Sequence, residues 1–196
     1  MNRGRAALLF ALLAGCGGTP PPDTSPIATS GVVGGTVQMS AVQGAAIQPI
    51  LVSVGGTMLN TNVSRPGDFV IANVPAGPLE LRFTGEGVAA ILPVGEIAGG
   101  ETVTMSIRLT PAAAAIESIS RIRGSEAVVE GAIEEPGMQL PPDTLIVGGR
   151  TITIPPGTAV KAGLNGVAAA LKPGTRVRVT GTASATGVTA REIVIL

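Results

Sequence analysis

Two side chains that often carry enzyme chemistry, those of His and Cys, are nearly missing from this chain of 196 residues. It contains no His and a single Cys, Cys16. Without His there is no imidazole base, no Ser-His-Asp triad and no His-ligated zinc. One Cys forms neither an internal disulfide nor a cluster of thiolate ligands. The thiol of Cys16 is therefore the reactive group whose surroundings matter most.

The residues before Cys16 have the three parts of a secretory signal peptide. Residues 1–5 carry two Arg and no acid, residues 6–13 (AALLFALL) are apolar, and small residues follow. A basic start, a short apolar stretch and small residues are typical of such a leader. The apolar run of eight residues is far shorter than the about 20 that a membrane-spanning helix needs. We expect residues 1–15 to direct export and then to be removed.

The end of this leader reads Leu13-Ala14-Gly15-Cys16 and directly follows the apolar run. It resembles the lipobox of bacterial lipoprotein precursors, an L-[AS]-[GA]-C pattern. The resemblance implies thioether lipidation of Cys16, cleavage before it by the lipoprotein signal peptidase, and attachment to a membrane of the bacterial cell envelope. Each buried CH₂ contributes about 0.8 kcal/mol, so two or three acyl chains give lasting attachment.

The segment that follows the leader has little to bury. Residues 16–30 (CGGTPPPDTSPIATS) are rich in Pro, Gly, Ser and Thr. That composition is typical of an extended linker. At about 3.1 Å per residue, this tether would hold the folded part up to about 40 Å from the lipid surface.

Carboxylates could in principle hold a metal ion. The acidic residues that lie closest together are Glu126, Glu130, Glu134, Glu135 and Asp143. They lack the D-x-[DN]-x-[DN]-G spacing of a calcium loop. Glu134 and Glu135 are neighbours on an expected strand, so their side chains would face opposite ways. We therefore expect no metal site and no cofactor.

A carboxylate pair could also cleave glycosides without His. Such enzymes usually line the cleft with aromatic side chains, and beyond the leader the chain keeps only Phe69 and Phe83. Both lie on alternating strands and are interpreted as core residues. Lys161 and Lys172 could act as nucleophiles only if buried, which their Gly- and Pro-flanked settings do not suggest. We expect no catalytic residue.

Residues 31–110 alternate apolar and polar side chains, which is the pattern of half-buried antiparallel strands. The clearest runs are residues 50–54, 79–83 and 103–109. Turn signals separate the runs at Gly55-Gly56, Pro66-Gly67, Pro75-Ala76-Gly77 and Gly99-Gly100. Short strands at about ten-residue spacing predict a β-sandwich over residues 31–110.

Three segments of this module form a recognisable series: GTV at residues 35–37, GDFVIANVPAG at residues 67–77 and LELRF at residues 79–83. They resemble the carboxypeptidase-regulatory-like (transthyretin/prealbumin-like) family, which shows G-x-V, then D-G-x-F-x-I-x-N-V-P-x-G, then an alternating strand. This chain has Gly67-Asp68 where that family has Asp-Gly. The resemblance implies a prealbumin-like β-sandwich with a structural or adhesive role.

Residues 116–196 form a second module after a small-residue linker at 111–115. Residues 112–122 have the composition for one or two weak helical turns, and residues 167–172 predict a short helix that Pro173 ends. The expected strands are residues 127–134, 144–147, 150–154, 175–182 and 188–195. Three strands, a short helix and two strands predict a small OB-like β-barrel, so the whole protein is expected to be all-β.

The same module carries VEGAI at residues 129–133, IVGGRTI at 146–152, TAV at 158–160, LKPGTRVRVTG at 171–181 and GVTAREI at 187–193. These segments resemble a bacterial family of exported β modules known only as domain of unknown function fifty-six sixty-six. The resemblance implies a setting in the bacterial envelope and brings no known activity.

Barrels of the OB type often bind single-stranded nucleic acid through aromatic platforms and a basic groove. Residues 116–196 contain no Phe, Tyr or Trp, and 8 basic side chains stand against 7 acidic ones. We therefore expect no nucleic-acid partner. Five arginines are interpreted as a solvated barrel face, with an anion site as the alternative: Arg121, Arg123, Arg176, Arg178 and Arg191.

Together these observations predict a non-catalytic envelope lipoprotein, exported from the cytoplasm and anchored through lipid on Cys16. Its two β modules would contact an envelope protein or a polysaccharide. The alternative is a structural spacer or an assembly subunit of an envelope complex. A hydrolase that uses carboxylates is the third possibility.

Overall fold

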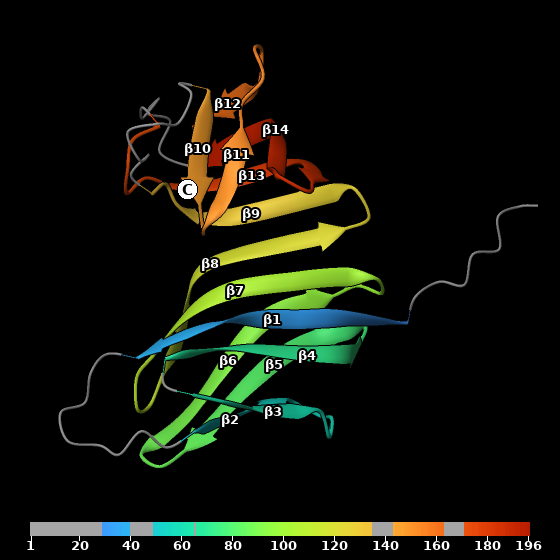
Figure 1. The fold of residues 1–196 in the computed structure, drawn as a ribbon, viewed down its shortest axis with the longest axis vertical. Coiled ribbons are helices and arrows are strands. Elements are labelled where there is room, and N and C mark those ends of the chain that lie inside the picture. Colours follow the sequence, from blue (N-terminus) through green and yellow to red (C-terminus); the bar gives the residue numbers. More distant parts are fainter. Residues whose placement is uncertain (1–28, 40–48, 65, 135–142, 163–170) are drawn as a thin grey trace, which may run out of the picture.

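The computed structural model describes residues 29–39, 49–64, 66–134, 143–162 and 171–196. These residues form fourteen β-strands in two sheets and no helix (Figure 1). The predicted all-β class is therefore confirmed. The lipobox, Cys16, nearly all of the tether, Glu135 and most of the helix predicted at residues 167–172 lie outside the described residues.

The N-terminal half of the fold consists of two sheets packed face to face. The smaller sheet has the strand order β3-β2-β5-β6, with β2 at Ile50–Val54, β3 at Asn60–Val63, β5 at Gly77–Gly85 and β6 at Val88–Ile97. Facing it lie β1 (Ser30–Met39), β4 (Gly67–Pro75) and β7 (Glu101–Leu109) of the larger sheet. Strand β1 pairs antiparallel with β4 and parallel with β7.

One hydrophobic core fills the space between these sheets. The alternation in residues 50–54, 79–83 and 103–109 is confirmed, because every second residue of each run is apolar and buried, and these residues come from both sheets. Phe69 and Phe83, at 4% and 1% exposure, are core residues as predicted.

The larger sheet continues beyond the sandwich through β8 (Ala114–Arg123) and β9 (Glu126–Ala132). Strand β7 pairs antiparallel with β8, and β8 pairs antiparallel with β9. The linker predicted at residues 111–115 contains the tight turn between β7 and β8, in which the Thr110 amide donates to the Ala113 carbonyl at 2.8 Å. The helical turns predicted at residues 112–122 are wrong, since β8 begins at Ala114, pairs with β7 along its length and pairs with β9 from Ile119 onward.

The C-terminal strands close into a ring that begins and ends at β9. The other members are β10 (Thr144–Val147), β11 (Arg150–Thr153), β13 (Arg176–Ser184) and β14 (Gly187–Ile195). Strand β9 pairs with β13, β13 with β14, β14 with β11, and β11 with β10. A bridge between Ile133 and Val147, and a 2.8 Å bond from the Glu134 amide to the Ile146 carbonyl, complete the ring.

The ring encloses a second hydrophobic core. Val177 and Val179 point into it at 0% exposure, as predicted, while Arg176 and Arg178 are exposed. Strand β12 (Ala159–Lys161), which the sequence did not indicate, adds in parallel to β14.

Strand β8 contributes to both cores. Ile116 and Ile119 pack against the sandwich core, whereas Ile122 packs against the barrel core. The two cores therefore meet at β8, and the barrel lies beyond β8 at the end of the larger sheet (Figure 1). Ser120 of β8 is 5% exposed, and its hydroxyl has no hydrogen-bond partner among the described residues.

The barrel needs a glycine at position 181 because two strands approach closely there. A Cβ on Gly181 would lie 2.1 Å from the Thr189 carbonyl oxygen, beside a bulge in the β13–β14 ladder. The substitution Gly181→Ala is expected to lower the free energy of unfolding by about 2–3 kcal/mol, the usual cost of forcing an extra carbon into packed structure. Urea denaturation followed by circular dichroism measures the loss.

The neighbouring exposed residue Thr182 provides the matched control. The substitution Thr182→Ala is expected to stay within about 0.5 kcal/mol of the wild type. Equal urea midpoints for the two variants would contradict a steric role for Gly181.

Candidate functional site

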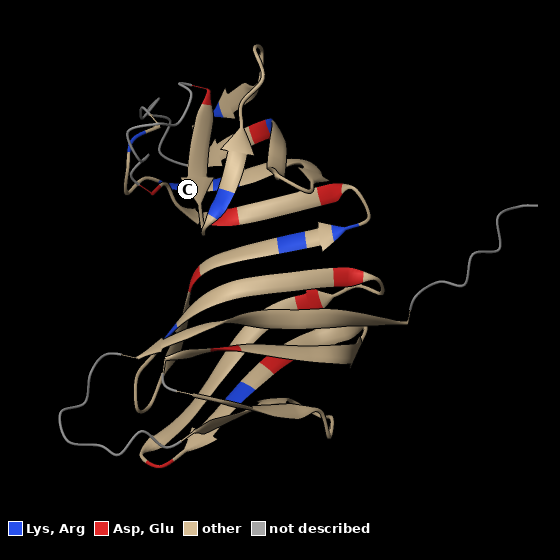
Figure 2. Ribbon diagram, viewed as in Figure 1, with Lys and Arg blue, Asp and Glu red and all other residues tan. Residues whose placement is uncertain are grey.

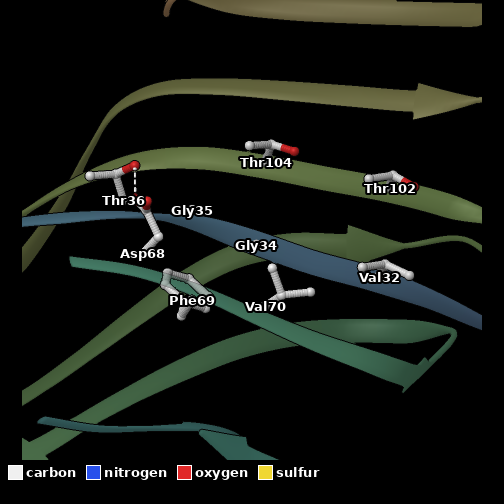
Figure 3. A pocket seen from close by; sticks show the side chains of 9 residues that line it. All are labelled: Val32, Gly34, Gly35, Thr36, Asp68, Phe69, Val70, Thr102 and Thr104. Atoms are coloured by element: carbon white, nitrogen blue, oxygen red, sulfur yellow. Dashed lines mark hydrogen bonds between the residues drawn. The ribbon is translucent and has the colours of Figure 1, made fainter. Parts of the chain in front are cut away.

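A hollow of about 320 Å³ lies on the outer face of the larger sheet, over β1, β4 and β7 (Figure 3). It is open to solvent on the face of the sheet that points away from the sandwich core. Its lining residues are Val32, Gly34, Gly35, Thr36, Asp68, Phe69, Val70, Thr102 and Thr104. No sequence motif pointed to this hollow, because its walls come from three strands that are distant in the chain.

Gly34 forms the floor of the hollow. Strand alternation places Val33 in the core at 0% exposure and Gly34 on the outer face, opposite Val70 of β4 and Thr104 of β7. A Cβ on Gly34 would lie 3.1 Å from the Phe69 carbonyl oxygen and 3.4 Å from Cγ2 of Val70. The missing side chain therefore leaves a trough between two taller walls.

The two ends of the trough differ chemically. At one end the Thr36 hydroxyl donates a hydrogen bond to Oδ1 of Asp68 at 2.6 Å. At the other end lies Val32, while Val70, which is 67% exposed, stands beside Gly34 in the middle of the trough. Strand β1 carries no charged residue and β4 carries only Asp68, so this carboxylate is the one charge that lines the hollow (Figure 2).

A network around Arg121 lies where the sandwich meets β8. Arg121 Nη1 donates to the Glu96 carbonyl at 2.7 Å and to Glu101 Oε1 at 3.1 Å, and Nη2 donates to the Val94 carbonyl at 2.7 Å. Glu101 Oε2 accepts a 2.7 Å hydrogen bond from the Ala98 amide. This network links β8 to β6 of the opposite sheet and to β7.

The interpretation of Arg121 as part of a solvated barrel face is therefore wrong. Its side chain is 23% exposed and that of Glu101 is 11% exposed. The sequence could not show this, because the acceptors on β6 lie 25 and 27 residues away in the chain.

The other four arginines of that group are mainly exposed. Arg178 pairs with Glu130 across β13 and β9, with Nε and Oε1 2.5 Å apart. Arg123, Arg176 and Arg191 are exposed and lie on three different strands, β8, β13 and β14. The structure therefore does not gather the five arginines into one anion site.

The acidic residues considered as metal ligands are spread apart. Glu130 pairs with Arg178, while Glu134 Oε1 accepts a 2.7 Å hydrogen bond from the Gly149 amide in the β10–β11 turn. Glu126 is exposed at the far end of β9, and Asp143 precedes β10. Within the described ranges no three Asp, Glu, Cys or His side chains gather as a metal site.

The two lysines considered as nucleophiles lie on the surface. Lys161 forms an ion pair with Glu192, and its side chain is 65% exposed. Lys172 is exposed.

Among the residues that the structure describes, no helix is long and apolar enough to cross a membrane. Comparisons with protein-family models, curated proteins and solved structures find no match to this chain.

Proposed function

We propose that this protein is a non-catalytic lipoprotein of the bacterial cell envelope that presents a rigid β surface to a partner. The lipobox at residues 13–16 supports export, acylation of Cys16 and attachment to a membrane. The tether of residues 16–30 would let the folded part stand away from the lipid.

The finer fold assignments belong to this proposal. An OB-like barrel is supported by the ring order β9-β10-β11-β14-β13 and by the parallel pairing of β11 with β14. A prealbumin-like sandwich is supported by the two face-to-face sheets with a shared core and by the segments at residues 35–37 and 67–83. A module of the family named domain of unknown function fifty-six sixty-six is supported by the segments at residues 129–193.

The observation that carries the binding function is the hollow on the outer face of β1, β4 and β7. It lies on a sheet that continues without a break into the barrel, so its shape does not depend on a mobile joint between modules. A preformed surface loses little conformational entropy when a partner binds. We therefore assign this face, which includes the exposed Val70, to contact with an envelope protein or a polysaccharide.

The unbroken sheet also favours the second candidate, a structural spacer or assembly subunit. A spacer has to keep its two ends at a fixed separation. The β7-β8-β9 pairing would do so, because it joins the two cores through backbone hydrogen bonds. The two candidates differ in whether the outer face of β4 meets a specific molecule.

Site-specific cross-linking in intact membranes tests the binding function. The substitution Val70→Cys, coupled to a photoactivatable maleimide, places the probe in the hollow, and acylation of Cys16 leaves no competing thiol. Ile91→Cys is the matched control, because Ile91 is 58% exposed on β6 of the opposite sheet. We expect a discrete protein or polysaccharide adduct from position 70 and none from position 91. Equal adducts from both positions, or none from either, would contradict the proposal.

A further inference from the structure

We propose that the hollow over Gly34 binds a basic side chain, Lys or Arg, from an extended segment of a protein partner. This inference rests on the proposed binding function and names the chemistry of its partner. It is carried by the shape of the trough, by the carboxylate at one end of it and by its position near β4, the last strand of the larger sheet in the described part of the chain.

The trough has the shape for an aliphatic stem. Its floor is the backbone of Gly34, and methyl groups of Val32 and Val70 stand beside it. Gly34 and Thr36 are two residues apart on one strand, which corresponds to about 7 Å. A Lys or Arg stem that enters over Gly34 can therefore run along β1 and bring its cationic end to Thr36 and Asp68. Such side chains commonly bury their methylene groups while the charged end stays in water.

The carboxylate of Asp68 is placed to receive that charge. Thr36 holds Oδ1, and none of the ion pairs in the described part of the chain involves Asp68. By contrast, Glu80, Glu117 and Glu192 each pair with a Lys or Arg on their own or a neighbouring strand. An anionic group beside an apolar trough complements a side chain that is apolar along its length and cationic at its end.

The position of the trough favours a polypeptide partner over a glycan. Strand β4 is the last strand of the larger sheet, so an extended segment can approach along its edge and project a side chain over Val70. The only aromatic residue among the lining residues, Phe69, is 4% exposed and points into the core, so no ring is free to stack on a sugar. Thr102 and Thr104 of β7 form the opposite wall of the trough.

The test is a titration of the full lipidated protein in lipid nanodiscs, with ¹³C-labelled Thr and Val methyl groups as reporters. The probe is the peptide acetyl-Gly-Lys-Gly-amide, and the matched probe carries norleucine in place of Lys, which keeps the stem and removes the charge. We expect saturable shifts at Thr36, Val70 and Thr104 with the Lys peptide, and about fivefold weaker binding, read from the same shifts, with the norleucine peptide.

Two variants separate the charge from the shape. Asp68→Asn keeps an oxygen for Thr36 and is expected to weaken binding of the Lys peptide about fivefold, which is the upper value for one exposed ion pair. Gly34→Ala raises the floor and is expected to weaken binding of both Lys and Arg peptides. The inference is overturned by an absence of saturable shifts, by equal binding of the norleucine peptide, or by unchanged affinity in Asp68→Asn. In each case an adduct at position 70 would still support the proposed binding function.

Discussion

Replacement of Cys16 by Ala is expected to release the protein from the membrane almost completely. The thiol of Cys16 is the only acceptor for a thioether-linked lipid, because the chain has no other Cys. Each acyl chain contributes about 0.8 kcal/mol per buried CH₂, so loss of two or three chains removes the whole affinity that holds the protein at the bilayer. Cleavage before residue 16 should fail as well, so the precursor is longer by 15 residues and keeps the leader, whose apolar run of eight residues is too short to span the bilayer.

Metabolic labelling with palmitate and fractionation of cells measure both effects. The wild type should carry label and sediment with membranes, whereas Cys16→Ala should be unlabelled. Thr19→Ala is the matched control within the tether and should behave like the wild type. Equal labelling and sedimentation of Cys16→Ala would overturn the lipoprotein assignment, and mature protein beginning at Met1 in the cytoplasm would do the same.

The second large effect is expected for Arg121→Met, which keeps an aliphatic stem and removes the guanidinium. The variant leaves Glu101, 11% exposed at its side chain, without its cation, and leaves the Val94 and Glu96 carbonyls without their donor. Breaking a buried pair from one side costs about 3–5 kcal/mol, and we expect about 3 kcal/mol because Arg121 keeps some contact with water.

Chemical denaturation of Arg121→Met and Arg108→Met distinguishes this network from an ordinary surface ion pair. Arg108 pairs with Glu117 across the same two strands, but its side chain is 62% exposed. Loss of that pair is expected to cost less than about 1 kcal/mol. A double-mutant cycle with Glu101→Gln then isolates the Arg121–Glu101 interaction. Similar losses for the two Met variants would show that Arg121 has no special role at the joint.

Much of the strand pattern could be predicted because most strands bury only one face. Alternation in residues 50–54, 79–83 and 103–109 reports that geometry directly. Strand β8 escaped prediction because it contributes to cores on both of its faces. Its isoleucines at 116, 119 and 122 are spaced by three, which imitates a helix, and a bulge opposite Ser106 and Ile107 shifts the register.

The candidate site was beyond prediction for a different reason. Gly34, Val70 and Thr104 meet only because β1 lies between β4 and β7, and no local pattern specifies that order. The charge of Arg121 predicts a surface position. In the structure, however, its guanidinium donates to two carbonyl groups of β6, a strand in the other sheet. The local sequence predicts which apolar side chains point into the core. Which polar groups come into contact depends on the pairing of strands that are distant in the chain, and the local sequence does not specify that pairing.

The parallel pairing of β1 with β7 has a consequence for how the chain folds. Val32 lies beside Thr102 and Met39 beside Leu109, so some seventy residues separate the partners in each row. A chain that emerges from its N-terminus first cannot complete this ladder until residue 109 is available. Until then, the edge of β1 that pairs with β7 is open to incorrect pairing. The loop that must close is long, so formation of this ladder is slow. Chaperones would have their greatest effect during this interval.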